Sequence, residues 1–254
     1  MDRKKGSWRT VIGAIAAVSL AISVIYAIVM VIISPSGKKS HYVIIALECL
    51  FGILAVILPG VLDRKWSFGI PDYVYTTYFI FLYCAIFLGS VLGFYSLIPQ
   101  WDTILHAISG AMLGVLGFCL VSVCNRSEKI PVNLTPFFVA LFAFCFALAV
   151  GAVWEIYEYT GDGLLGMNMQ RFNLSDGTAL QGRAALYDTM KDIIVDAISA
   201  LIVAIIGYFP TKKAYVKASR KKFVIDVTDD TDSEEQDDIY GGCIFDQTGS
   251  EKDC

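Results

Sequence analysis

Six long runs of apolar residues, separated by polar connections, dominate the pattern of the chain. The runs cover residues 11–33, 42–62, 75–97, 101–123, 134–157 and 186–209. A helix needs about 20 mostly apolar residues to cross the roughly 30 Å hydrocarbon core of a bilayer, and each run is long enough. The pattern therefore predicts an all-α polytopic membrane protein, built as a bundle of six transmembrane helices.

The charge distribution separates a tail from this membrane domain. Of the 254 residues, 56% are hydrophobic and 17% are charged, whereas soluble domains average about 25% charged residues. Residues 223–254 hold 11 acidic residues and one basic residue, so their net charge is −10, while residues 1–222 carry +6. We expect a basic N-terminus at 1–10, a six-span domain at 11–210, and a disordered tail, first basic and then acidic, at 211–254.

The same distribution indicates which partners to expect. An acidic chain with six apolar runs is not a DNA-binding domain, so no nucleic-acid partner is expected. The expected partner is the lipid bilayer, and the basic residues between 212 and 222 suit its anionic headgroups. The acidic part of the tail could meet a cytoplasmic partner.

Lysine and arginine residues near the span ends predict the orientation, because they are enriched on the cytoplasmic side. With a cytoplasmic N-terminus, the cytoplasmic segments hold 14 such residues, and the opposite side holds Lys38, Lys39, Arg171 and Arg183. Both termini are therefore predicted to be cytoplasmic. The long loop 159–185 then lies on the outer face, where it is either a lid over a site or a flexible connection.

Ionisable residues inside the apolar runs are the candidate functional residues, because charges within a bilayer are costly and usually functional. These residues are Glu48, Asp102, His106, Glu155, Glu158, Asp188, Lys191, Asp192 and Asp196. In the predicted orientation, all nine lie in the outer half of the bilayer. Glu48 could join the others or face the bundle alone.

Helical spacing places most of these residues on three acidic stripes, because residues three or four apart share a helix face. The stripes are Asp102 with His106, Glu155 with Glu158, and Asp188 with Asp192 and Asp196. Glycine and alanine residues continue each stripe, and small residues allow membrane helices to approach closely. We therefore expect three helices to pack through these faces with their polar ends converging.

Six carboxylates converging on one imidazole cannot all be charged and unpaired, so either several are protonated or a cation lies among them. Lys191 is the fixed basic partner, and Arg171 and Arg183 of the loop could contribute. Helix capping could explain Asp102 and Asp188, which lie at helix starts. It cannot explain the Glu155 stripe, which lies at a helix C-terminal end.

We therefore predict a site for a divalent metal ion. The expected ligands are His106, Glu155, Asp188 and Asp192, with Asp102, Glu158 and Asp196 as catalytic residues that orient ligands or move protons. Carboxylates with one imidazole suit Zn²⁺, Mn²⁺ or Fe²⁺, and carboxylates alone suit Mg²⁺ or Ca²⁺. A proton relay could use the same residues.

Three stretches resemble the YjdF-type family of bacterial inner-membrane proteins, over roughly residues 40–210. They are W-D-T-I-L-H-A-I-S-G at 101–110, W-E-I-Y-E at 154–158 and L-Q-G-R-A-A-L-Y-D-T-M-K-D-I-I-V-D at 180–196. The resemblance implies a bacterial cytoplasmic membrane and supports His106, Glu155, Asp188 and Asp192 as family positions. The family has no established activity, and this chain has Ser199-Ala200 where relatives tend to have Gly-Ala.

Three functions are compatible with such a site. The first is a metal-dependent membrane enzyme, such as a hydrolase that acts on lipid or envelope headgroups. The second is a proton- or cation-coupled transporter, which would need a polar route to the cytoplasmic side. The inner halves of the spans carry no ionisable residue, which argues against that route. The third is a non-catalytic membrane interaction protein whose polar cluster only fixes helix packing.

Overall fold

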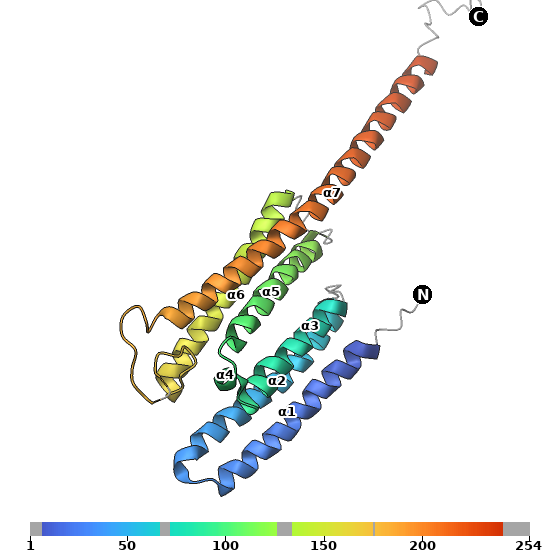
Figure 1. Ribbon diagram of the computed structural model, residues 1–254. Coiled ribbons are helices and arrows are strands. Elements are labelled where there is room, and N and C mark those ends of the chain that lie inside the picture. The colour runs from blue at the N-terminus through green and yellow to red at the C-terminus, as the bar shows by residue number, and fades with distance from the viewer. Residues whose placement is uncertain (1–6, 67–71, 126–133, 175, 241–254) are drawn as a thin grey trace, which may run out of the picture. The chain divides into compact units, whose positions relative to one another are not determined.

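The computed structural model describes residues 7–66, 72–125, 134–174 and 176–240, and it is helical (Figure 1). The elements are α1 (Ser7–Ile33), α2 (Ser36–Trp66), α3 (Asp72–Leu82), the π-helix η1 (Tyr83–Val91), α4 (Phe94–Leu97), α5 (Trp101–Asn125), α6 (Pro136–Leu165) and α7 (Tyr187–Tyr240). Several basic residues used to predict the orientation lie outside the described residues: Arg3, Lys4, Lys5, Arg126 and Lys129.

Six helical stretches are long and apolar enough to cross a membrane by length and composition. They are Thr10–Ile33, Ser36–Val61, Asp72–Val91, Trp101–Cys124, Pro136–Leu165 and Tyr187–Lys217. Large apolar side chains such as Ile15, Phe51, Val153 and Ile198 are exposed on these stretches, as a hydrocarbon surrounding allows. The predicted all-α fold with six candidate membrane spans is confirmed.

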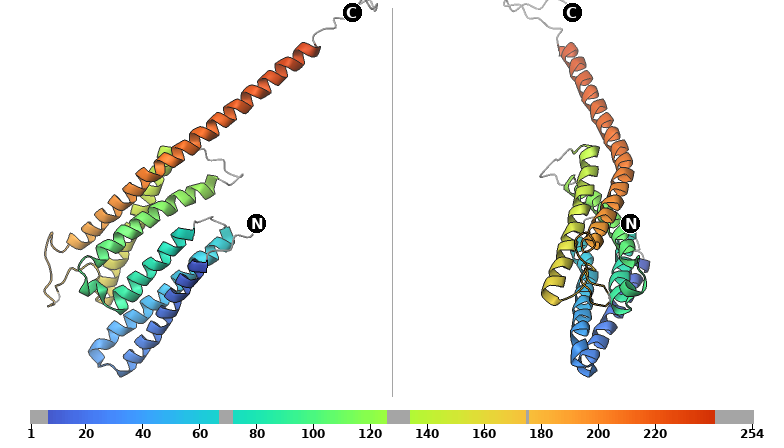
Figure 2. Two further views of the ribbon diagram at one scale, coloured as in Figure 1. Left: turned by 45° about the vertical axis from the view of Figure 1, so that its right-hand side comes forward. Right: turned by 60° about the vertical axis from the view of Figure 1, so that its left-hand side comes forward.

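The first three spans pack around an apolar core. Helices α1 and α2 lie side by side (Figures 1 and 2), and α3 also packs against α1. Leu20 and Ala27 of α1 and Ile45 and Cys49 of α2 form the buried centre of this core. Ile86 and Phe87 of η1 pack against it, so we call α1, α2, α3 and η1 the apolar region.

The third span departs from the single helix predicted at 75–97. Its last part is the π-helix η1, which ends at Val91, and Gly93 follows with a φ of 75°, in the left-handed region that favours glycine. The short α4 follows, and the ring of Tyr95 packs where a β-carbon on Gly89 would lie. The Trp101 indole nitrogen donates a hydrogen bond to the Cys84 carbonyl over 3.3 Å, which fixes the start of α5 against η1.

The last three spans pack through small residues, as predicted. A β-carbon on Gly117 of α5 would lie 2.7 Å from Ala143 Cα of α6. A β-carbon on Gly110 of α5 would lie 2.9 Å from the Asp196 carbonyl of α7. These approaches need residues without a side chain. We call α5, α6 and residues 187–208 of α7 the polar region.

Helix α6 is longer than the predicted run 134–157. It begins after Thr135, whose hydroxyl accepts a hydrogen bond from the Phe138 amide over 3.4 Å. It ends at Leu165, before Gly166 with a φ of 63°. The extension places Asp162 on the same helix as Glu155 and Glu158.

The chain divides into two compact units, Met1–Tyr208 and Phe209–Cys254. Helix α7 begins one residue after the predicted start and is helical to Tyr240, past the predicted domain boundary at 210. Residues 241–254 lie outside the described residues. The disorder expected for 211–254 stays a prediction.

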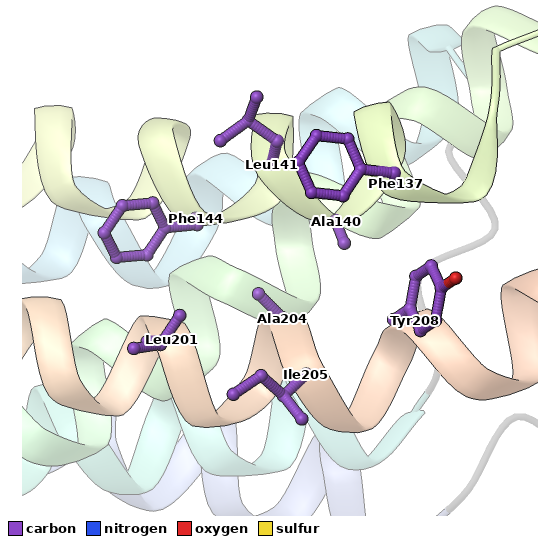
Figure 3. A pocket seen from close by; sticks show the side chains of 8 residues that line it. All are labelled: Phe137, Ala140, Leu141, Phe144, Leu201, Ala204, Ile205 and Tyr208. Carbon is purple, nitrogen blue, oxygen red and sulfur yellow. The ribbon is translucent and has the colours of Figure 1, made fainter.

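An apolar groove runs between α6 and α7 (Figure 3). Phe137 and Phe144 of α6 face Leu201 and Ile205 of α7 across it. Its apolar lining suits the hydrocarbon interior of a bilayer. The groove lies toward the start of α6, whereas Glu155 and Glu158 lie toward its end.

Candidate functional site

The structure brings all seven predicted site residues together in the polar region. All of them are buried, and we call them the acid–histidine cluster: Asp102 and His106 from α5, Glu155 and Glu158 from α6, and Asp188, Asp192 and Asp196 from α7. Asp192 and Asp196 are only 1% and 2% exposed. Buried carboxylates at this density need counter-charges or protons.

His106 lies at the centre of the cluster. Its Nδ1 lies 3.1 Å from Asp196 Oδ2, within hydrogen-bond distance. Its Nε2 lies 3.8 Å from both Asp102 Oδ1 and Glu155 Oε1. A carboxylate at Nδ1 fixes the ring and favours a proton on that nitrogen, which leaves the Nε2 lone pair free to bind a cation.

Asp102, His106 and Asp192 form a group that could hold a metal ion. One ligand atom from each lies within 4.8 Å of the other two. Ligand atoms that each lie about 2.1 Å from one ion are about 3–4 Å apart, so small side-chain adjustments would suffice. Asp102, predicted as a catalytic residue, thus lies with two of the predicted ligands.

Several buried carboxylate oxygens make no hydrogen bond to any residue that the structure describes. Within the cluster they are both oxygens of Glu155, Oδ1 of Asp192 and Oδ1 of Asp196, and outside it Oε2 of Glu48 is another. Their charged contacts are long: Glu155 Oε1 is 3.8 Å from His106, and Asp192 Oδ1 is 3.4 Å from Lys191 Nζ. A buried acceptor without a partner is costly, so these oxygens indicate a cation or protons at this place.

Asp188 lies at the edge of the cluster, beside two bases. Its Oδ1 is 2.9 Å from Lys191 Nζ and 3.8 Å from a guanidinium nitrogen of Arg171. Among the predicted metal ligands, Asp188 is therefore the one that is directly ion-paired with lysine and arginine. Arg183, the other loop arginine, is exposed.

Glu158 and Glu48 lie in different surroundings. Glu158 Oε1 accepts a hydrogen bond from the Trp154 indole over 3.0 Å, so a residue one turn earlier on α6 holds it. Glu48 lies on α2, and the Ser90 hydroxyl of η1 is close to its carboxyl group. The acid–histidine cluster comes from α5, α6 and α7 alone, so Glu48 belongs to the apolar region.

Two glycines allow the three helices to approach one another closely at Asp196. A β-carbon on Gly110 would contact the Asp196 backbone, and one on Gly151 of α6 would overlap Asp196 Oδ2, the oxygen bound to His106. The three helices therefore cross around one buried carboxylate. The same small residues that permit close packing also place the acids around His106.

Asp162 is the residue that sequence reasoning missed. Its carboxylate is buried and accepts hydrogen bonds from the amides of Met169 (2.7 Å) and Gln170 (3.0 Å). It follows Glu158 by four residues, so the helical spacing that identified the other stripes could have found it if the end of α6 had been placed correctly. Asp162 fastens the loop that leads to Arg171.

Arg171 bridges the cluster and the turn before α5. Its guanidinium lies 3.7 Å from Asp102 Oδ2, and it contacts the carbonyls of Pro99 (3.4 Å) and Tyr95 (3.5 Å). The Arg171 backbone has a φ of 49°, an uncommon value for a residue with a β-carbon. These contacts hold the loop in an arrangement that directs this arginine to the acids.

Tyr95 lies where the two regions meet, outside the membrane spans. Burial raises the pKa of its phenol above the ordinary value of 10, and the nearby carboxylates of Asp102, Glu158 and Glu48 add to the rise. The phenol is therefore neutral at physiological pH. The phenol interacts electrostatically with carboxylates of both the apolar and the polar region.

Comparison with known proteins gives the family of the chain but no activity. An uncharacterised protein of Thermotoga maritima is 26% identical over 190 residues, which cover 67% of this chain and 90% of the relative. No solved structure matches the chain significantly. Residues 15–213, which include all six apolar helical stretches apart from a few terminal residues, match a family described as predicted membrane proteins. The chain therefore belongs to this family of multi-pass membrane proteins, DUF2238.

Proposed function

We propose that this protein is a metal-dependent membrane enzyme that hydrolyses an ester in lipid or envelope headgroups. The observation that carries the proposal is the Asp102/His106/Asp192 group, whose ligand atoms lie within 4.8 Å of one another, together with the buried Oδ1 of Asp192, which accepts no hydrogen bond and meets Lys191 Nζ only at 3.4 Å. A buried carboxylate oxygen without a hydrogen bond is what a cation site presents before the ion is added. Carboxylates with one imidazole suit Zn²⁺, Mn²⁺ or Fe²⁺.

The distances suggest a role for each residue. His106 would bind through Nε2, with Asp102 and Asp192 as carboxylate ligands and Asp196 holding the imidazole ring. Asp188 would position Lys191 and Arg171 and would not bind the ion. This assignment exchanges the roles predicted for Asp102 and Asp188.

Glu155 is the candidate general base. Its carboxylate is buried close to the Thr189 hydroxyl, and Oε1 lies on the Nε2 side of His106. A divalent cation, when bound, activates a water molecule and polarises an ester. Glu155 would accept the proton of that water, and Glu158, held by Trp154, would move it away.

Close packing argues against a transport route through the polar region. Beyond Asp196, α5 meets α7 at Gly114 and Val203, and it meets α6 at Gly117 and Ala143. These contacts leave apolar atoms where a relay would need polar groups. An enzyme open to one side fits this arrangement better than a proton- or cation-coupled transporter.

Metal analysis of the detergent-purified protein tests the proposal. Wild-type protein should bind about one divalent ion per chain when it is offered Mn²⁺ or Zn²⁺, and His106→Ala and Asp192→Ala should lose it. The matched control is Asp176→Ala, which removes an exposed carboxylate from the loop. Retention of metal in both site variants, or no metal in any well-folded sample, would overturn the proposal. In the latter case, proton-coupled transport or partner binding becomes the better hypothesis.

The membrane and orientation are part of the same proposal. We place the protein in a bacterial cytoplasmic membrane, as the resemblance to the YjdF-type family implies, with both termini cytoplasmic and the loop 159–185 outside. The excess of lysine and arginine on the cytoplasmic side supports this orientation. A reporter fused after Phe209 should be active only if it requires the cytoplasm, whereas one inserted at Gly177 should report the opposite side.

A further inference from the structure

Two basic side chains form the outer layer of the acid–histidine cluster. The side chains of Arg171 and Lys191 are 31% and 23% exposed, whereas the carboxylates that they contact are only 2–10% exposed. Charge is therefore layered, with acids inside and bases toward the surface. A ligand that approaches the cluster from this side meets the bases first.

The contacts that the structure describes for the Arg171 guanidinium are all long. Its contacts with Tyr95, Pro99, Asp102 and Asp188 are all 3.4–3.8 Å long. Charge-assisted hydrogen bonds of arginine are about 2.7–2.9 Å long, and a guanidinium has five donors. Lys191, by contrast, makes one short contact of 2.9 Å with Asp188. The guanidinium therefore lies among several acceptors but makes no short hydrogen bond to any of those that the structure describes.

The loop fixes this arginine before any ligand arrives. Asp162 binds the amides of Met169 and Gln170, the two residues that precede Arg171. The Gln170 side chain donates to the Thr189 hydroxyl on α7 over 2.8 Å, which ties the loop to the helix that carries Lys191. A binding group that is held in this way loses little further freedom when it binds.

We infer that Arg171 and Lys191 recognise a phosphate group, so that the substrates of this site are phosphate-bearing anions. The inference rests on the proposed function, because a bound cation offsets carboxylates that would otherwise repel phosphate. The guanidinium fork fits two phosphate oxygens, and an ammonium group provides a second point of positive charge. Once a bound cation offsets the carboxylates, the positive charges of Arg171 and Lys191 match the roughly two negative charges of an ionised phosphomonoester. The phosphate can belong to a lipid headgroup or to a soluble molecule, and the recognising chemistry is the same.

Binding measurements on the full-length protein in detergent test this inference. Metal content is measured first with Mn²⁺ alone, and inorganic phosphate is then titrated into the Mn²⁺-loaded protein by calorimetry. Arg171→Gln and Lys191→Gln should each weaken phosphate binding about tenfold, the usual effect of losing one charge-assisted hydrogen bond. Both should keep their metal. Arg183→Gln, which removes an exposed arginine from the same loop, should bind phosphate like the wild type.

A second arm separates the two sources of phosphate. Nanodiscs that contain phosphatidic acid are compared with nanodiscs that contain phosphatidylcholine of the same chain length. If the ligand is a lipid, phosphatidic acid should bind preferentially and this preference should depend on Arg171. If the ligand is soluble, only inorganic phosphate should show the dependence.

The outcomes distinguish this inference from the proposed function. Bound Mn²⁺ without phosphate or phosphatidic acid binding overturns the anion site and leaves the metal site intact. Phosphate binding that is unchanged in both Arg171→Gln and Arg171→Lys also overturns the anion site. The lysine variant keeps the positive charge, so it serves as a control for a folding defect in the glutamine variant. A wild type without metal overturns the proposed function. Phosphate binding that still depends on Arg171 in the presence of a chelator would then support the anion site alone, and its absence would overturn that site as well.

Discussion

The apolar and polar regions are both built from membrane-spanning helices, but their contacts differ in kind. In the apolar region, Leu20, Ile45 and Cys49 fill a core in which one hydrophobic side chain can replace another of similar volume. In the polar region, glycines let three helices close around Asp196 and His106. The apolar core depends on the volume of its side chains, whereas the polar region depends on particular carboxylate and imidazole atoms and on glycines without a side chain. Substitutions should therefore affect the two regions differently.

The largest difference is expected for metal binding. Asp196→Asn removes the charge that holds His106 Nδ1, and loss of such a supporting carboxylate typically costs about 10- to 100-fold in metal affinity. Cys49→Ala, at an equally buried position in the apolar region, should leave the affinity unchanged. Competition titration with a metal-binding dye measures both. Equal affinities in the two variants would mean that Asp196 does not act through His106.

Glycine-to-alanine substitutions should lower the stability of the protein more in the polar region than in the apolar region. In Gly110→Ala the new methyl group would meet Asp196 backbone atoms at 2.9–3.0 Å, so α5 and α7 must move apart, at a cost of about 1–3 kcal/mol. In Gly52→Ala it would meet the terminal methyl groups of Ile86 and Leu20, which can rotate away. Thermal unfolding in detergent should show a clear loss for Gly110→Ala and little change for Gly52→Ala.

Gly163→Ala is the matched control for these glycine substitutions. Nothing lies within 4 Å of its new methyl group, and alanine favours the helix by about 0.5–1 kcal/mol. It should therefore raise the unfolding temperature slightly. An equal loss of stability in Gly52→Ala and Gly110→Ala would show that the two regions do not differ in tolerance.

Release of the loop should be a smaller, local effect. Asp162→Ala leaves the amides of Met169 and Gln170 without their acceptor, so the segment before Arg171 should open more often. Trypsin should then cut after Arg171 as well as after the exposed Arg183. Asp176→Ala, which removes a carboxylate that binds the Thr178 amide farther along the loop, should keep the wild-type cleavage pattern at Arg171. Protection of Arg171 in Asp162→Ala would show that other contacts hold the loop.

The smallest expected effect concerns pH. Burial and neighbouring carboxylates raise the pKa of the Tyr95 phenol in the folded protein. Above about pH 10 the phenol therefore ionises in the unfolded chain but stays neutral in the folded protein. The contribution of this group to stability therefore falls as the pH rises above 10. Tyr95→Phe should reduce that loss, whereas Tyr187→Phe, at an exposed tyrosine, should not. Unfolding temperatures between pH 9 and pH 11 provide the measurement.

Much of the fold and the membership of the cluster could be predicted from the sequence, because membrane spans appear as long apolar runs and the acidic stripes as residues three or four positions apart. The gathering of Asp102, His106, Glu155 and the three α7 aspartates follows from spacing and small residues. The helix break at Gly93 could not be predicted, because apolar residues continue on both sides of it. The pairing of Asp188 with Arg171 depends on how a loop folds back, and a loop has no such periodicity.

The end of α6 illustrates the limit most clearly. Hydropathy falls after Tyr157, so the predicted run stopped there, although the helix continues to Leu165. The continuation is polar and includes Gly161 and Asp162, because it lies under the loop that Asp162 binds. Tertiary contacts, which a single-sequence pattern does not show, stabilise that last part of the helix.

The three-helix crossing at Asp196 also has a consequence for how the protein is made. A chain that enters the membrane from its N-terminus inserts α5 and α6, with Asp102, His106, Glu155 and Glu158, before the last span is synthesised. During that interval the nascent protein holds three carboxylates and one imidazole in the bilayer without Asp192, Asp196, Lys191 or the fully anchored loop. The apolar region, by contrast, has all its helices at that stage. Biogenesis of this protein is therefore most exposed to failure, and to recognition by quality-control proteases, in the time between the fifth and sixth spans.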